Sequence, residues 1–174
     1  MSRAWMQELC GEPHQIYLST PFAAELDGEQ WDCATNGYAV LMLRGPSEFA
    51  GKPRPAPAPP VRAIFEQEFG SRVPVSLDEL RGWAYSSETT DGCQWCEQAA
   101  VLPAPGYLCG QRVNRRLVWE FLSLVHAETV EVAVAPTERG PVLIDAGAWR
   151  VVVMPMLLQP EVGEVDADDV PRFP

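Results

Sequence analysis

A Cys-x-x-Cys pair is the clearest arrangement in this sequence with the spacing for site chemistry. Cys93 and Cys96 are spaced like half of a tetrahedral zinc site, and Cys109 is the next cysteine along the chain. A fourth ligand would have to be brought in by the fold from among Cys10, His14, Glu97 and His126. Two interpretations stay open: a zinc clip in a long loop, with Cys93, Cys96 and Cys109 as ligands, or incidental thiols. We expect no resident cofactor and at most substoichiometric zinc.

Side chains for hydrolytic catalysis are few and scattered. His14 and His126 are the only histidines, and Asp27, Asp32 and Asp145 are separated from one another by expected turns. General acid–base catalysis needs such groups within hydrogen-bond reach of one another. No nucleotide-binding glycine loop is present, and no βαβ unit surrounds the cysteine pair to favour thiol redox chemistry. The sequence predicts a protein that is not an enzyme, and a thiol enzyme is the least favoured alternative.

Three arginines form the one cluster of cations, at Arg112, Arg115 and Arg116. They precede or open an expected helix, where each positive charge opposes the helix dipole by ~0.3–1 kcal/mol. A nearby phosphate would explain this unfavourable placement, which makes the three residues candidates for DNA binding. The alternative is three solvated arginines, because a net charge of −11 argues against a protein that coats DNA non-specifically.

Composition predicts a single globular domain. The chain has 174 residues and is 47% hydrophobic, which is enough for one core without covalent staples. No run approaches the ~20 apolar residues that span a bilayer, and the amino terminus lacks an apolar run of signal-peptide length. An odd number of cysteines in a chain of this size is typical of reduced thiols. We therefore expect a cytoplasmic protein.

The elements that must position these residues begin with three expected strands, at residues 15–26, 29–35 and 38–44. Asp27-Gly28 and Asn36-Gly37 separate them, and both pairs favour tight primed turns, whose central residues need positive φ. Residues 45–60 are proline-rich and without periodicity, which indicates an extended surface linker. Helices are expected at residues 62–69 and 76–85, the second opened by a Ser76-x-x-Glu79 capping box. Residues 86–110 are expected to be loop-rich.

The chain becomes regular again at Asn114, a good N-cap for an apolar helix. Strands are expected at residues 129–135, 142–146 and 149–158. This order of elements predicts an α+β fold with mainly antiparallel sheet, in which two three-stranded units lie edge to edge with the Asn114 helix across them. Residues 159–174 are expected to be a disordered acidic tail. The residues expected to be buried are Ile16, Leu18, Val40, Met42, Leu117, Phe121, Leu124, Val132, Leu143 and Val151.

Two motifs resemble the bacterial DNA polymerase III β sliding clamp. The segment Val152-Val-Met-Pro-Met156 is similar to the V-V-M-P-M-R-L with which that chain characteristically ends, and Ala34-Thr-Asn-Gly-Tyr38 resembles its A-T-D-G-H-R turn. The sequence departs from the family at Tyr38, Ala39 and Leu157, where the clamp usually has His, Arg and Arg. A clamp ring contains six domains with two DNA-facing helices each. This chain offers one domain, and its first such helix is nearly absent.

The resemblance implies a single DNA-clamp-like domain over residues 1–158, with an insertion at residues 45–110. It also implies a non-catalytic protein of DNA replication or repair, akin to a processivity factor. Weak, salt-dependent DNA binding would involve the three arginines. Peptides of polymerases or repair proteins would bind in a groove formed by Thr35, Gly37, Tyr38, Val152, Met154, Pro155 and Met156.

Three further expectations accompany this interpretation. Alternate residues of the last strand would instead pack into the core if no groove formed. The chain could also be an interaction module that has kept the clamp fold without binding DNA and works through its proline-rich and Cys-x-x-Cys insertion. Finally, clamp domains join by continuing one sheet into the next, so an exposed sheet edge favours a homodimer.

Overall fold

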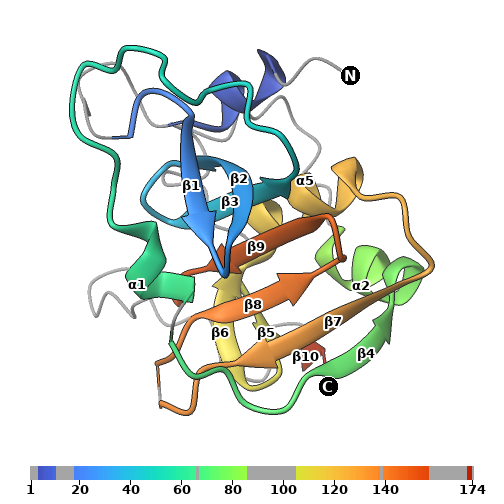
Figure 1. Cartoon of the computed structure of the whole chain (residues 1–174). Helices are drawn as coiled ribbons and strands as arrows, with labels where there is room; N and C mark the ends of the chain where they lie inside the picture. The colour runs from blue at the N-terminus through green and yellow to red at the C-terminus, as the bar shows by residue number, and fades with distance from the viewer. Residues whose placement is uncertain are drawn as a thin grey trace.

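The computed structural model describes residues 4–10, 18–65, 67–85, 105–137, 139–156 and 172–173. Its main feature is a seven-stranded sheet in the order β1-β2-β3-β9-β8-β7-β4, and every neighbouring pair in it is antiparallel (Figure 1). A small second sheet has the order β10-β5-β6. The α+β class and the mainly antiparallel sheet expected from the sequence are confirmed.

The first meander contains β1 (Phe22–Leu26), β2 (Glu29–Thr35) and β3 (Ala39–Arg44). Leu26 pairs with Glu29, so Asp27 and Gly28 form a two-residue turn with φ values of 55° and 76°. Positive φ at both positions is what a primed turn requires, and the predicted bounds of β2 are confirmed. β1 is shorter than the strand expected at residues 15–26, of which residues 15–17 lie outside the described residues.

The second turn is longer than the primed turn expected at Asn36-Gly37. Thr35 pairs with Val40, which leaves four residues in the loop, and Gly37 is the residue with positive φ, at 87°. The Asn36 side chain is the reason. Its Oδ1 accepts hydrogen bonds from the backbone N–H groups of Tyr38 and Ala39, both at 3.0 Å, and so builds a local turn of its own.

The second meander contains β7 (Thr129–Val134), β8 (Val142–Asp145) and β9 (Trp149–Val153). β3 pairs with β9 from Ala39↔Val153 to Leu43↔Trp149, which joins the two meanders edge to edge as predicted. β9 ends earlier than expected, because Pro155 has no N–H to donate to the ladder. A strand that the sequence did not indicate, β4 (Val73–Ser76), pairs with β7 at the far edge.

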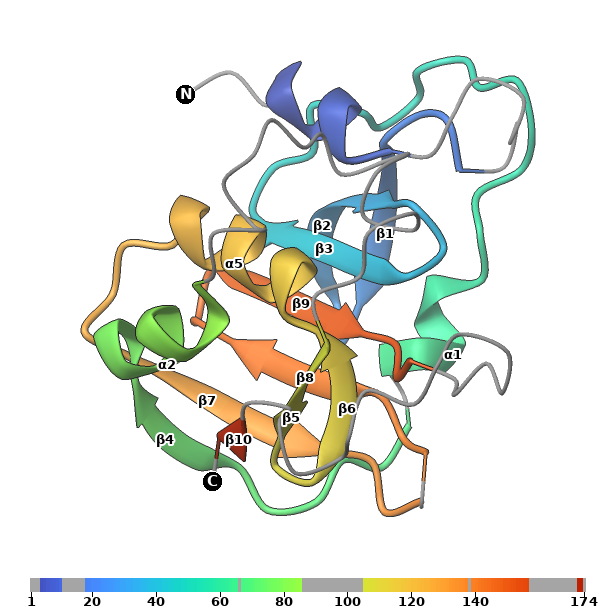
Figure 2. The same ribbon diagram turned by 180° about the vertical axis from the view of Figure 1, so that it is seen from behind.

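Two helices cover one face of the sheet: α2 (Leu77–Ala84) and α5 (Arg115–Leu124) (Figure 2). The Ser76 side chain caps α2 by accepting from the N–H of Glu79, and the Asn114 side chain caps α5 by accepting from the N–H of Arg116. Both caps were predicted. A short helix, α1 (Val61–Phe65), and a 3-10 helix, η1 (Ala4–Leu9), complete the helical elements of the described residues.

The sheet has apolar packing on both faces because its side chains alternate. Leu41, Val151 and Val153 belong to the larger core beneath α2 and α5. Val40 and Met42 lie on the other face with Val61 of α1. Residues expected to be buried and found so are Val40, Met42, Leu117, Phe121, Val132, Leu143 and Val151. Leu18 and Leu124 are half-buried, and Ile16 lies outside the described residues.

Two segments differ from the loop and the disordered tail expected there. β5 (Pro105–Leu108) and β6 (Gln111–Asn114) form a hairpin leading into α5. Near the carboxyl end, β10 (Arg172–Phe173) pairs in parallel with β5. Phe173 makes an edge-to-face contact with Trp83, at 5.9 Å between ring centroids, and this apolar contact anchors β10 to α2. None of the described helices combines the length and the apolar character needed to cross a membrane.

Candidate functional site

An apolar groove lies where the β2–β3 loop, the end of β9 and α1 meet. Its volume is about 170 Å³. The structure thus brings together Thr35, Gly37 and Met154, three of the residues predicted to bind peptides, from two distant parts of the chain. The full lining is Leu18, Thr35, Gly37, Val40, Pro59, Pro60, Val61, Ile64 and Met154.

The β2–β3 loop presents an apolar surface to this groove because it satisfies its own polar groups. The Thr35 hydroxyl donates to the carbonyl oxygen of Ala39 at 2.8 Å and accepts from the N–H of Gly37 at 3.1 Å. Gly37 adopts the left-handed region that favours glycine, and a Cβ there would lie 3.3 Å from Cδ1 of Leu18. The Thr35 hydroxyl and the N–H groups of Gly37, Tyr38 and Ala39 are therefore engaged within the loop.

The end of β9 forms the opposite wall. The N–H of Met154 donates to the carbonyl oxygen of Tyr38 at 2.9 Å, which continues the β3–β9 contact one residue beyond the ladder. Met154 and Tyr38 are 38% and 51% exposed, and both are among the exposed large apolar residues of the described part of the chain. Met154 thus adds an adaptable apolar side chain to the groove, whereas Tyr38, also predicted to contact a peptide, is not among its lining residues.

Other residues predicted for the groove are placed elsewhere. Val152 is fully buried and packs with Ala133 and Leu143, so its prediction as a peptide contact is wrong, and the alternative of core packing holds for it. The cause is alternation along β9, which directs Val152 into a core. Pro155 and Met156 are half-buried and do not line the groove, and the N–H of Met156 donates to the carbonyl oxygen of Arg112.

The residues that sequence reasoning missed come from the proline-rich linker and α1. Pro59, Pro60, Val61 and Ile64 line the groove, although the linker was interpreted as a surface spacer. The available signal was the short apolar run that follows the prolines, in which Val61 is buried and Ile64 is half-buried.

Two of the three arginines predicted to bind DNA, Arg115 and Arg116, are engaged in the fold. Arg116 is 1% exposed, so its prediction as a surface contact is wrong. The Arg115 guanidinium donates to the carbonyl oxygens of Trp83 and Tyr85, at 2.9 and 3.4 Å. Arg112 is half-buried in β6. The helix α5 turns Arg115 towards α2 and Arg116 into the core, and sequence spacing did not reveal these directions.

The helix layer, formed by α2 and α5, carries exposed acids on its surface. Asp78 and Glu79 in the first turn of α2 and Glu128 after α5 are exposed, whereas Arg81 donates to the carbonyl oxygens of Leu122 and Val125. Burial raises the pKa of Glu120 to about 7, and the nearby Arg116 cation offsets part of that rise. The helix layer therefore lacks the basic character of a DNA-binding surface.

The predicted zinc ligands are only partly described. Cys93 and Cys96 lie outside the described residues. Cys109 is half-buried at the β5–β6 turn, and burial raises the pKa of its thiol. Burial also raises the pKa of the Cys10 thiol to about 11. The residues that the structure describes contain no group of three potential metal ligands.

No protein-family model matches the sequence, and no curated protein matches it. Solved structures do match. The DNA polymerase III β subunit of Thermotoga maritima aligns with a TM-score of 0.60 at 12% identity, over 88% of this chain and 63% of that chain. A Caulobacter crescentus β sliding clamp with PEG bound gives 0.60 at 11% identity, over 88% and 62%. A Pseudomonas aeruginosa DnaN sliding clamp bound to griselimycin gives 0.57 at 11% identity, over 91% and 64%.

The chain spans less than two thirds of the length of each of these clamps. Likeness at such low identity concerns the arrangement of the backbone rather than any particular site. That arrangement is the one implied by the motifs around Asn36 and Met154, which here lie side by side. The chain has the fold of the bacterial DNA polymerase III β sliding clamps.

Proposed function

We propose that this chain is a non-catalytic, sliding-clamp-like protein of DNA replication or repair that binds a short apolar peptide of a partner protein. The observation that carries the proposal is the groove of about 170 Å³, to which Thr35, Gly37 and Met154 contribute from opposite ends of the sequence. These residues belong to the two segments whose sequences resemble the clamp family. The clamp fold supports the role in replication or repair, and the groove supports the peptide.

The chemistry of the groove defines the peptide. Seven of its nine lining residues have hydrocarbon or thioether side chains, or are proline, and the Thr35 hydroxyl is already bonded within its own loop. A polar side chain would lose its hydration there without gaining a partner. An engineered apolar cavity of about 150 Å³ binds benzene, so this groove has the size for one Leu or Phe side chain. The exposed Met154 side chain would contact the neighbouring peptide residues.

Peptide binding is preferred over DNA binding because of where the charges lie. Arg115 and Arg116 are engaged in the packing of α5, and exposed acids occupy the helix layer. A net charge of −11 adds long-range repulsion of a polyanion. Any DNA binding should therefore be in the micromolar range or weaker and should fall steeply with salt.

Fluorescence anisotropy with labelled pentapeptides tests the proposal. The probes carry Leu or Phe at the centre, the control peptide carries Ala there, and griselimycin serves as an unlabelled competitor. We expect the Leu or Phe peptide to bind more tightly than the Ala peptide, and Met154→Lys to weaken binding by tenfold or more. Val73→Lys is the matched control, because Val73 is an exposed apolar residue, 51% accessible, on β4 at the far edge of the sheet.

Equal binding of the Leu, Phe and Ala peptides would contradict the proposal, as would equal losses in the two lysine variants. A DNA arm uses a labelled duplex at several salt concentrations. Duplex binding that is tighter than micromolar and lost on Arg112→Ala would favour the DNA-binding alternative instead.

A further inference from the structure

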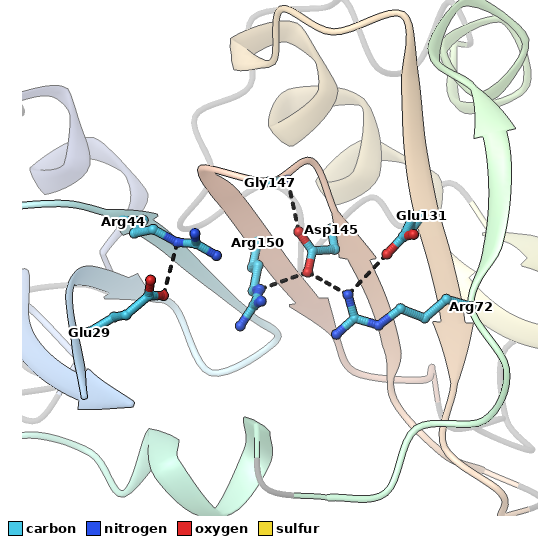
Figure 3. A network of polar contacts seen from close by, with 7 residues as sticks. All are labelled: Glu29, Arg44, Arg72, Glu131, Asp145, Gly147 and Arg150. Atoms are coloured by element: carbon cyan, nitrogen blue, oxygen red, sulfur yellow. Dashed lines mark hydrogen bonds and ion pairs between the residues drawn. The ribbon is translucent and has the colours of Figure 1, made fainter. Parts of the chain in front are cut away.

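A second pocket, of about 320 Å³, contains a cluster of three arginines and differs in its chemistry from the apolar groove. The arginine cluster consists of Arg44 at the end of β3, Arg72 just before β4 and Arg150 on β9. Figure 3 shows Arg72 and Arg150 meeting at Asp145, with Arg72 also reaching Glu131, whereas Arg44 pairs with Glu29. Asp145 and Glu131 also line the pocket. The clamp fold and the peptide groove do not account for this cluster.

Asp145 holds two of the three guanidinium groups in place. It is 6% exposed, and its Oδ1 accepts a hydrogen bond from the N–H of Gly147 at 2.8 Å. Its Oδ2 accepts from Nη1 of Arg72 at 2.9 Å and from Nε of Arg150 at 2.7 Å. Because both arginines contact the same oxygen atom, their guanidinium groups are close neighbours. A buried carboxylate with both oxygens bonded is a rigid support for them.

The third guanidinium group, that of Arg44, lies against a buried tryptophan ring. The Cζ atoms of Arg44 and Arg150 lie 5.1 and 4.8 Å from the centroid of the Trp31 ring, and Trp31 is 1% exposed. Arg44 also pairs with Glu29 at 3.1 Å, but both of those side chains are well exposed. The ring restrains two like charges side by side that would otherwise separate in water.

The donors and charges of this pocket favour an anion. Its lining includes three arginines against two acids, an excess of one cation in a chain of net charge −11. Glu29, which pairs with Arg44, lies outside the lining. Arg72 makes both of its contacts through Nη1, and Arg150 makes its contact through Nε. A guanidinium has five N–H donors in a planar fork. Within the described residues, the remaining donors of Arg72 and Arg150 are therefore available to a ligand.

We propose that this pocket binds a small oxyanion, namely a phosphate group. Fixed guanidinium forks match the oxygen spacing of phosphate, and a dianion suits three cations better than a single carboxylate does. A small phosphate compound contacts only the local positive cluster. A nucleic acid would extend over the surrounding acidic surface and be repelled by it.

The alternative is an ion-pair ladder that only strengthens the sheet, since Arg150↔Asp145 and Asp145↔Glu131 are cross-strand pairs. A ladder predicts a loss of stability on mutation but no saturable ligand binding. The two interpretations therefore differ in a direct binding measurement.

Isothermal titration calorimetry with pyrophosphate and with inorganic phosphate, in an oxyanion-free buffer of constant ionic strength, tests the proposal. We expect saturable binding to the parent protein, at least tenfold weaker in Arg72→Gln and in Arg150→Gln, and unchanged in Arg139→Gln. Arg139 is an exposed arginine outside the pocket and serves as the matched control. Arg72 has a side chain that is 44% exposed, so the Arg72→Gln protein keeps the test decisive if Arg150→Gln does not fold.

The proposal would be overturned if pyrophosphate and phosphate gave no saturable heat of binding with the parent protein, or if the parent and Arg72→Gln proteins bound them equally. A labelled single-stranded oligonucleotide provides the second arm. If it binds more tightly than pyrophosphate and loses that binding in Arg72→Gln, the assignment to a small phosphate compound is wrong. The peptide titration of the parent and Met154→Lys proteins is independent of this pocket, so the two proposals can fail separately.

Discussion

Arg115 donates a hydrogen bond from Nη1 to the carbonyl oxygen of Trp83, 2.9 Å away, and thereby ties the start of α5 to the end of α2. Arg81 makes the reciprocal contact from α2 to the carbonyl oxygen of Leu122, near the end of α5. Each arginine places its charge at the carboxyl-terminal end of the neighbouring helix, where free carbonyls and the helix dipole favour a cation. The unfavourable position of Arg115 in its own helix therefore has a structural reason.

Arg115→Ala should lower the free energy of unfolding by about 1–2 kcal/mol, because hydrogen bonds from a charged donor are lost and two carbonyls lose their partner. Urea unfolding measures this, and Arg139→Ala, at an exposed site, should change stability by less than about 0.5 kcal/mol. If the Arg115→Ala protein is as stable as the parent, this contact does not explain the position of Arg115, and Arg115 is again a candidate for DNA binding.

Phe121→Ala should lower the free energy of unfolding by about 3–5 kcal/mol. The Phe121 ring is 0% exposed in the larger core, so its removal leaves a cavity beneath α5. The exposed His126, just beyond the same helix, gives the comparison: His126→Ala should melt within a few degrees of the parent. A thermal melt that Phe121→Ala leaves unchanged would mean that α5 turns this face to solvent.

Glu120 should make the protein less stable as the pH rises. Burial raises the pKa of Glu120 to about 7 from an ordinary value of 4.5, with an opposing contribution from Arg116. The folded state thus keeps a proton that the unfolded chain releases, and stability falls between about pH 4.5 and pH 7. Glu120→Gln should remove this dependence and be more stable than the parent at pH 8 by about 1–2 kcal/mol, allowing for partial exposure.

Chemical denaturation of both proteins at pH 5 and pH 8 gives the comparison for Glu120. The difference in stability between parent and variant should grow with pH. A difference that is constant from pH 5 to pH 8 would mean that this carboxyl titrates normally in the folded protein.

Elemental analysis of tag-free protein should find less than one equivalent of zinc. The reason is that Cys93 and Cys96 supply only half of a tetrahedral site, and a Cys109 thiol with a raised pKa is a poor third ligand. The prediction would be contradicted by one full equivalent of zinc that is lost in Cys93→Ser and kept in Cys33→Ser. That result would make the insertion a zinc-bound loop. Cys33 is a fitting comparison because it is fully buried in β2.

The mass in solution should depend on protein concentration. The seven-stranded sheet ends at β1 and β4, and strand edges readily pair with a second copy. Pro74 lies in β4 and lacks an N–H, so a two-fold dimer should form through β1. Sedimentation across a range of concentrations measures this. One mass throughout, that of the monomer, would contradict the prediction.

Local chemistry in the sequence was enough to locate many of the elements. Asp27-Gly28 defined the first hairpin because few other residue pairs accept positive φ at both positions, and Ser76 and Asn114 marked the starts of α2 and α5 because their side chains cap free N–H groups. The short motifs around Asn36 and Met154 were enough to indicate the clamp fold. In each case, residues within a few positions of one another decide the conformation.

Contacts between distant segments could not be obtained in this way. The pairing of β4 with β7, the parallel contact of β10 with β5 and the coverage of the groove by α1 each join residues that no local pattern relates. The same holds for the direction of side chains. Arg116 is turned inwards and Arg44, Arg72 and Arg150 are gathered around Asp145 and Trp31, because burial and charge pairing are settled only when the whole sheet and both helices pack together.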